Sequence, residues 1–79
     1  MEDRIRQLFA TILQVDPERV RDDSDPATLE RWDSMQHLIL VSGFEEEFSV
    51  DVDPEEAVAM YANFAAFKKV VMQKLELRK

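Results

Sequence analysis

The stretch that decides the fold runs from Trp32 to Phe48 and reads WDSMQHLILVSGFEEEF. Its apolar residues recur at three- and four-residue spacing, which predicts a helix over 34–48. Asp33 is a good N-cap for this helix, and Gln36 falls at the third helical position, so the two residues can form a capping box. We expect Ser34 to open the helix. Its hydroxyl would then be exposed beside the backbone N–H groups of a helix start, which is a favourable place for an anion.

The predicted helix has a buried side and a solvated side. We expect burial of six apolar residues: Met35, Leu38, Leu40, Val41, Phe44 and Phe48. The solvated side carries Gln36 and the three consecutive acids Glu45, Glu46 and Glu47. Ser42-Gly43 in mid-helix costs roughly 1 kcal/mol against alanine, which indicates that another backbone packs closely there.

Working outward, local signals predict three more helices. The first covers about 2–14 and has an apolar stripe: Ile5, Leu8, Phe9, Ile12 and Leu13. A long connection follows over 16–32, with short helical turns expected near 17–20 and 27–30. Asp53-Pro54-Glu55-Glu56 starts a short helix that ends near Met60, and Asn63 caps a last helix over about 64–77. The whole is an all-α, four-helix bundle with a long first loop and a short third helix, forming one domain over 1–79.

Composition limits the function classes. With 79 residues and no cysteine, the chain is a small single domain without disulfides, thiolate metal sites or a cysteine nucleophile. Asp51-x-Asp53-x-Glu55 lacks the glycine and the final glutamate of a calcium loop, so we expect no metal site. The first residues lack a signal-peptide pattern and no apolar run reaches membrane-spanning length, so we expect a soluble, cytoplasmic monomer that does not insert into a membrane.

The net charge of −7 argues against nucleic acid as a partner. Between Trp32 and Asn63 the chain has no Lys or Arg to pair its eight acids: Asp33, Glu45, Glu46, Glu47, Asp51, Asp53, Glu55 and Glu56. The last twelve residues instead carry five bases: Lys68, Lys69, Lys74, Arg78 and Lys79. We therefore expect an acidic middle surface that meets a basic partner.

Taken together, the chain resembles the acyl carrier protein family over essentially its whole length. The residues that carry the resemblance are Trp32-Asp33-Ser34-Met35, Leu38, Leu40, Glu45-Glu46-Glu47-Phe48 and Asp53-Pro54-Glu55-Glu56. The resemblance implies that Ser34 carries 4′-phosphopantetheine, transferred from coenzyme A by a magnesium-dependent phosphopantetheinyl transferase, with Asp33 meeting that enzyme or its metal. It further implies a discrete carrier that catalyses nothing itself and holds acyl groups as thioesters for acyl-loading, acyl-transferring or condensing enzymes with basic docking surfaces.

Two further residue sets follow from the resemblance. Partner recognition is expected at Met35, Ile39, Glu45, Glu46, Glu47, Asp53, Glu55 and Glu56. A cavity that shelters the acyl chain is expected at Leu38, Phe44, Met60 and Phe64.

Some positions depart from the fatty-acid-synthesis pattern of the family. Trp32 stands in place of a small residue, Met35 in place of Leu, Ile39 in place of an acid, and Phe44 is bulkier than an aliphatic residue. These departures resemble carriers of polyketide or other specialised pathways more than housekeeping fatty-acid carriers. An aminoacyl or peptidyl carrier, and an unmodified acidic interaction module, remain alternatives.

Two aromatic residues near the serine have structural interpretations. Trp32 is expected to plug the space beneath the long loop. His37 lies one turn after Ser34, which is poor geometry for a serine–histidine proton transfer, and no third group orients it. We therefore expect His37 to be a surface or semi-buried polar residue rather than a catalytic one.

Overall fold

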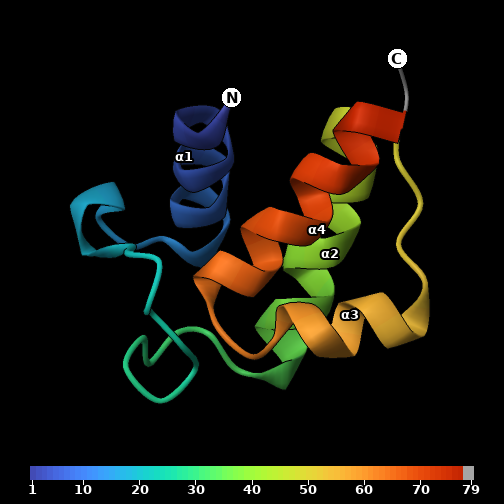
Figure 1. Cartoon of the computed structure of the whole chain (residues 1–79). Coiled ribbons are helices and arrows are strands. Elements are labelled where there is room, and N and C mark those ends of the chain that lie inside the picture. Colours follow the sequence, from blue (N-terminus) through green and yellow to red (C-terminus); the bar gives the residue numbers. More distant parts are fainter. Residues whose placement is uncertain (78–79) are drawn as a thin grey trace.

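A computed structural model describes residues 1–77, and Arg78 and Lys79 of the basic C-terminal segment lie outside that range. The described chain is all-helical and contains no strand (Figure 1). In order, its elements are α1 (Glu2–Leu13), the 3₁₀ turn η1 (Pro17–Arg19), α2 (Ser34–Phe48), α3 (Pro54–Met60) and α4 (Phe64–Leu77). The predicted four-helix architecture, with its long first loop and short third helix, is confirmed.

The helices begin where local side chains satisfy backbone N–H groups. The Gln36 N–H donates to Asp33 Oδ1 at 2.8 Å, and the Ala66 N–H donates to Asn63 Oδ1 at 2.7 Å. Before α3, the Asp53 N–H donates to Glu56 Oε1 at 2.9 Å, with Pro54 at the first helical position. These contacts use up donors that a helix start leaves without intrahelical partners, so they fix the start residues of α2, α3 and α4.

The capping box expected at α2 forms only in part. Asp33 accepts from Gln36 as predicted, but the Asp33 N–H donates to the carbonyl oxygen of Arg31 at 3.2 Å. The Asp33 N–H, which the Gln36 side chain would accept from in a full capping box, is therefore bonded within the tight turn over 31–33 instead. Near the turn predicted at 27–30, the Leu29 N–H donates to Asp25 O at 2.9 Å, the bond of one α-helical turn, but the segment does not continue into a helix.

The long loop is anchored to the bundle at several points. Val20, Leu29 and Trp32 are at most 3% exposed, which confirms Trp32 as a plug beneath the loop. At the start of α4, the Phe64 N–H donates to Ser24 O at 2.7 Å and the Ala65 N–H to Asp22 O at 3.0 Å. The loop therefore satisfies the first donors of α4, and its last residues lead directly into α2 in a fixed arrangement.

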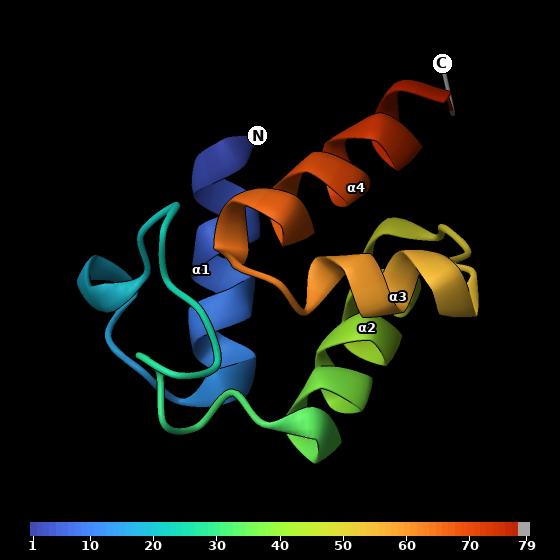
Figure 2. The same ribbon diagram turned by 60° about the horizontal axis from the view of Figure 1, so that its bottom comes forward.

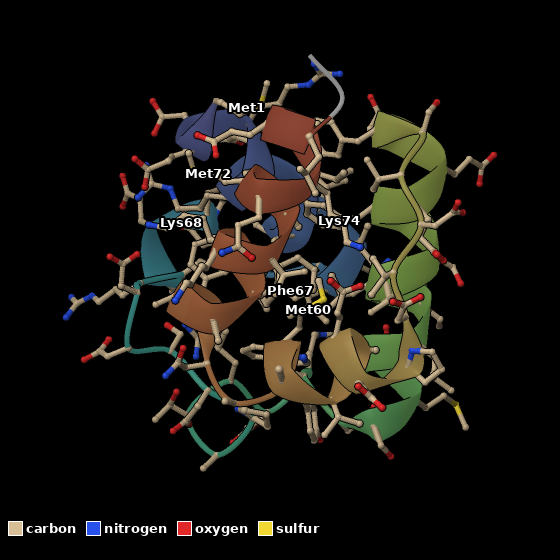
Figure 3. All side chains as sticks on the ribbon, turned by 45° about the vertical axis from the view of Figure 1, so that its right-hand side comes forward. Met1, Met60, Phe67, Lys68, Met72 and Lys74 are labelled. Atoms are coloured by element: carbon tan, nitrogen blue, oxygen red, sulfur yellow. The ribbon has the colours of Figure 1, made fainter. Side chains whose placement is uncertain are left out.

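The core is built around aromatic rings. Phe9 of α1 makes edge-to-face contacts with Trp32, Phe64 and Phe67 at centroid distances of 4.9, 4.9 and 5.1 Å. Figure 3 shows Phe67 of α4 and Met60 of α3 close together in the interior, where both are 0% exposed. Such edge-to-face pairs contribute about 0.5–1.5 kcal/mol each beyond the apolar area they bury.

The predicted buried side of α2 is partly wrong. Leu40, Val41, Phe44 and Phe48 are buried as expected, but Met35 and Leu38 are 70% and 67% exposed. Apolar residues occur all around α2, so their spacing does not single out the side that the other helices cover. The mid-helix Gly43 faces a side chain rather than the expected backbone, since a Cβ there would lie 2.8 Å from Ile12 Cδ1 of α1.

Candidate functional site

Ser34 is the first residue of α2 and its side chain is exposed. Asp33 precedes it in extended conformation and takes two donors of the first turn: its carboxylate accepts from Gln36 N–H, and its carbonyl accepts from His37 N–H at 2.8 Å. The N–H groups of Ser34 and Met35 remain at the helix tip for another acceptor. Because the dipole of the 15-residue helix also favours negative charge there, this tip suits a phosphate bound to the Ser34 oxygen.

The three other serines lie in less suitable places. Ser24 is 6% exposed, and its hydroxyl is held between Arg21 N–H and Arg19 O. Ser42 is exposed in the middle of α2, where backbone N–H groups are already bonded within the helix. Ser49 is the left-handed C-cap of α2, at the helix end that disfavours an anion. Of the serines, only Ser34 combines exposure with a helix N-terminus.

Exposed apolar side chains occur on the first turns of α2 and on α3. Met35, Leu38 and Ile39 are 70%, 67% and 49% exposed, and the spacing of Leu38 and Ile39 from Met35 places all three on one side of the helix. On α3, which lies beside the N-terminal half of α2 (Figures 1 and 2), Val58 is 76% exposed. We call Met35, Leu38, Ile39 and Val58 the apolar patch.

The acids predicted for partner recognition divide into two groups. Glu47 pairs with Arg4 of α1 at 2.9 Å, Glu56 pairs with Lys74 of α4 at 2.7 Å, and Glu45 accepts from Val52 N–H at 2.9 Å. The sequence expectation that these acids lack a base is therefore wrong for Glu47 and Glu56, because other helices supply one. Glu46, Asp53 and Glu55 are exposed and make no ion pair within residues 1–77.

The Glu56–Lys74 pair also affects the titration of both groups. The hydrogen bond from Lys74, followed by that from the Asp53 backbone, lowers the pKa of Glu56. In return, the bond to Glu56 raises the pKa of Lys74. Both groups thus stay charged at neutral pH, and the pair links α3 to α4 on the side of α4 opposite to Lys68 (Figure 3).

His37 is buried rather than exposed or semi-buried, at 6% exposure. The Trp32 indole N–H donates to its Nδ1 at 3.0 Å, and its Nε2 lies 2.7 Å from the carbonyl oxygen of Ala57 in α3. Burial lowers the pKa of His37, and the bond to the Ala57 carbonyl opposes that effect in part. Sequence reasoning missed this arrangement because both partners lie outside α2, although Trp32 and His37 are the only residues of their types in the chain.

Of the four residues expected to line an acyl cavity, three lie in the hydrophobic core and one does not. Phe44, Met60 and Phe64 are buried at 0–2% exposure, whereas Leu38 points to solvent. A surface groove of about 730 Å³ lies between the start of α1, the long loop and the start of α4, and Phe64 is the only one of the four that lines it. This groove contains no residue of α2, so it is separate from the Ser34 tip.

Two negative findings apply to the described residues. No helix within 1–77 is long and apolar enough to cross a membrane. No group of three or more His, Asp or Glu side chains in that range is arranged to hold a metal ion.

A family model for the phosphopantetheine attachment site matches residues 3–71. The match extends from the first turn of α1 to Val71 of α4, and it includes the whole of α2 and α3 together with the apolar patch.

Proposed function

We propose a specific role on the premise that this chain belongs to the phosphopantetheine-attachment family: it is an acyl carrier whose prosthetic group is bound to Ser34. The family is defined by 4′-phosphopantetheine covalently attached to a serine, so the chain is a phosphopantetheine-carrying protein. Carriers of this kind hold and deliver a group rather than catalyse a reaction.

The observation that carries the assignment to Ser34 is its position at the N-terminal tip of α2. The hydroxyl is exposed, and the N–H groups of Ser34 and Met35 are available to a phosphodiester at that point. Asp33 holds the first turn in place through Gln36 N–H. None of the other three serines offers both accessibility and an anion-favouring environment, which supports Ser34 further.

In the proposed loading step, the Ser34 oxygen attacks the phosphopantetheinyl phosphate of coenzyme A and displaces its nucleotide part. A phosphopantetheinyl transferase with magnesium supplies the catalytic groups and the metal. Asp33 is exposed beside the serine and has one carboxylate oxygen bonded to Gln36 N–H, so its charge remains accessible to that enzyme. The thiol at the end of the arm then forms thioesters, which the cysteine-free chain could not form by itself.

The partner enzymes would dock mainly on the apolar patch. Three of its four side chains lie on the first two turns of the helix that Ser34 opens, whereas Glu47 and Glu56 are engaged with Arg4 and Lys74. Glu46 and Glu55 are exposed and accessible to basic side chains of a partner at the edge of the contact. Association of this kind gains affinity from apolar burial and orientation from charge.

The packing of the core supports a carrier of specialised pathways more than a carrier of long fatty acyl chains. Phe44 is 0% exposed, lies 4.8 Å from Phe67 and 5.7 Å from Phe48 between ring centroids, and fills the space beside α2. A long acyl chain would need that space, since displacing packed rings costs free energy. We therefore propose short or polar acyl cargo, as in polyketide or related pathways.

The test is intact mass after incubation with coenzyme A, magnesium and a broad-specificity phosphopantetheinyl transferase. Wild type is compared with Ser34→Ala and, as a matched control, Ser42→Ala on the same helix. The proposal expects one added phosphopantetheinyl group in wild type and in Ser42→Ala and none in Ser34→Ala. Loading of Ser34→Ala would reassign the site, and no loading of folded wild type would favour an unmodified interaction module.

A further inference from the structure

We infer that His37 is a positioning residue: its neutral ring fixes the first turn of α2 against Trp32 and α3, and protonation of the ring breaks the bond to Trp32. The ring bridges two hydrogen-bond partners from different parts of the chain. Trp32 Nε1 lies 3.0 Å from Nδ1, and the Ala57 carbonyl oxygen lies 2.7 Å from Nε2. Ser34 is the first residue of the helical turn that His37 holds in place.

The two partners determine which ring nitrogen carries the proton. An indole N–H can only donate, so Nδ1 of His37 must be the unprotonated acceptor. A carbonyl oxygen can only accept, so Nε2 must carry the hydrogen. One neutral tautomer therefore satisfies both bonds, and neither the other tautomer nor the imidazolium does.

The bond to Ala57 gives a partner to a carbonyl group near the C-terminal end of α3. The last four carbonyl groups of a helix have no intrahelical partner, and Ala57 is the first of those four in α3. The Tyr61 N–H, which would otherwise approach it, donates to Val58 O at 3.1 Å instead. Among residues 1–77, the His37–Ala57 contact is the one side-chain hydrogen bond that joins α2 to α3.

The bond to Trp32 acts on the other side of the turn. Trp32 directly precedes Asp33 and Ser34, is 1% exposed, and packs edge-to-face on Phe9 of α1. His37 itself contacts the Tyr61 ring at a centroid distance of 4.8 Å. The serine-bearing turn is thus held from the loop side and from the α3 side through a single ring.

Protonation makes this arrangement unfavourable. An imidazolium would direct an Nδ1–H group at the Trp32 N–H, placing two donors against each other in a buried site. The titratable groups on the elements around His37 are Asp33 and Glu45–Glu47 at the two ends of α2, Asp53, Glu55 and Glu56 at the start of α3, Tyr61 after α3, and Lys68, Lys69, Lys74 and Glu76 on α4. Of these, the Tyr61 ring contacts His37, and Glu56 is already paired with Lys74. Within residues 1–77, no carboxylate is hydrogen-bonded to the ring to stabilise its charge.

A change at His37 would alter the surface beside the serine. Met35, Leu38 and Ile39 are exposed on the first two turns of α2, so a change in how Trp32 and His37 hold the start of that helix changes the surface that they form. This last step rests on the proposed function. The bonding arrangement itself does not, and it can be tested without any prosthetic group.

The chain has one tryptophan and one histidine, so the donor and the acceptor of the Trp32–His37 hydrogen bond each give a signal that can be assigned without ambiguity. We would follow the His37 ring ¹⁵N shifts and the Trp32 indole N–H resonance by NMR, and the Trp32 emission maximum by fluorescence, from pH 8 downward. His37→Gln is the matched variant, because a glutamine amide both accepts and donates but does not ionise. Far-UV circular dichroism on the same samples separates local release from global unfolding.

The inference expects the Nε2–H tautomer at neutral pH. It also expects the Trp32 resonance and emission to shift with the same midpoint as His37 while helicity is retained, and that transition to be absent from His37→Gln. An Nδ1–H tautomer, Trp32 signals that stay constant while His37 titrates, the same transition in His37→Gln, or loss of helicity in the same step would each overturn it. Failure of Ser34 to accept phosphopantetheine would leave these results unchanged, so the two proposals fail separately.

Discussion

Asp33 combines two roles that substitutions can separate. Its carboxylate caps α2 through Gln36 N–H, and its charge lies next to Ser34. Asp33→Asn keeps a good cap and removes the charge, whereas Asp33→Ala removes both. We expect Asp33→Ala to lower the free energy of unfolding by about 1 kcal/mol and Asp33→Asn to leave it nearly unchanged.

Denaturant unfolding measures the stability of both variants, and the rate of loading by the transferase measures recognition. If Asp33 serves recognition, both variants load slowly. Normal loading of Asp33→Asn would show that the residue is a helix cap alone.

His37 makes stability depend on pH in a defined direction. Burial holds the pKa of the folded-state ring below its ordinary value of 6.5, so the unfolded chain binds a proton at a pH where the folded chain does not. Stability then rises with pH over that window, because the unfolded state binds more protons. The free energy of unfolding should fall as pH drops below about 6.5 and stop falling once the folded ring is protonated as well.

The measurement is a series of urea denaturations of wild type and His37→Gln between pH 8 and pH 5. Carboxylates titrate in both proteins, so the difference between the two curves isolates His37. Parallel curves over this range would contradict the prediction.

At the scale of elements, two effects oppose each other at Gly43, where α1 and α2 meet: alanine favours the helix, but its Cβ would crowd Ile12. Alanine in place of glycine in a helix interior gains about 1 kcal/mol, but its Cβ would lie 2.8 Å from Ile12 Cδ1. We expect Gly43→Ala to gain less than the helix-propensity value, because the Ile12 side chain must shift. In an Ile12→Val background, which removes Cδ1, the same substitution should gain close to the full amount.

Thermal or denaturant unfolding of the four proteins in this double-mutant cycle gives the coupling energy. A coupling near zero would mean that Ile12 moves aside without cost. The single variants Gly43→Ala and Ile12→Val serve as the controls for the double variant.

If the apolar patch on α2 and α3 is a docking surface, a substitution in it should weaken binding of the transferase without changing the stability of the fold. Leu38 is 67% exposed, so Leu38→Glu should change the free energy of unfolding by no more than about 0.5 kcal/mol. The same change places a charge in the proposed contact and should weaken docking of the transferase, seen as a raised KM for the carrier. Thr11→Glu, at an exposed position on α1, controls for the added charge. An equal effect of the two variants on KM would argue against the patch.

Helix boundaries were predictable because their signals are local. Asp53-Pro54 and Asn63 start α3 and α4 where expected, since each cap is completed by residues within the same turn. The buried side of α2 was predicted only in part: apolar residues lie all around this helix, and only the tertiary structure leaves Met35 and Leu38 exposed. The ion pairs of Glu47 and Glu56 were also not predictable from local sequence, because their partners Arg4 and Lys74 belong to other helices.

For the candidate site, sequence reasoning gave the place of Ser34 but not its supports. An N-cap followed by serine is readable from adjacent residues, and the structure has Ser34 exposed at that helix start. The bond from His37 to Ala57 spans 20 residues of sequence and depends on how α3 lies beside α2. Such a contact follows from the packing of the whole bundle, so no spacing within α2 could indicate it.

At the scale of the whole molecule, Lys68 connects three parts of the bundle. Its Nζ lies 2.7 Å from Glu2 at the start of α1 and 2.7 Å from Asp22 in the long loop, while its backbone belongs to α4. The side chain is only 16% exposed, so the pairs are less screened than ordinary surface pairs. We expect Lys68→Gln to lower the free energy of unfolding by about 1 kcal/mol, the upper end of the range for exposed pairs.

Lys69→Gln is the matched control, because it removes the same charge from an exposed neighbouring position that has no ion pair within residues 1–77. Both variants remove one positive charge from a chain whose net charge is already −7, so the change in long-range repulsion is the same in both and cancels in the comparison. Stability is measured by denaturant unfolding at low and high salt. The excess loss in Lys68→Gln should shrink at high salt, since salt screens attraction between charges. Equal losses in the two variants at low salt would mean that the long loop and α1 are held by their apolar anchors alone.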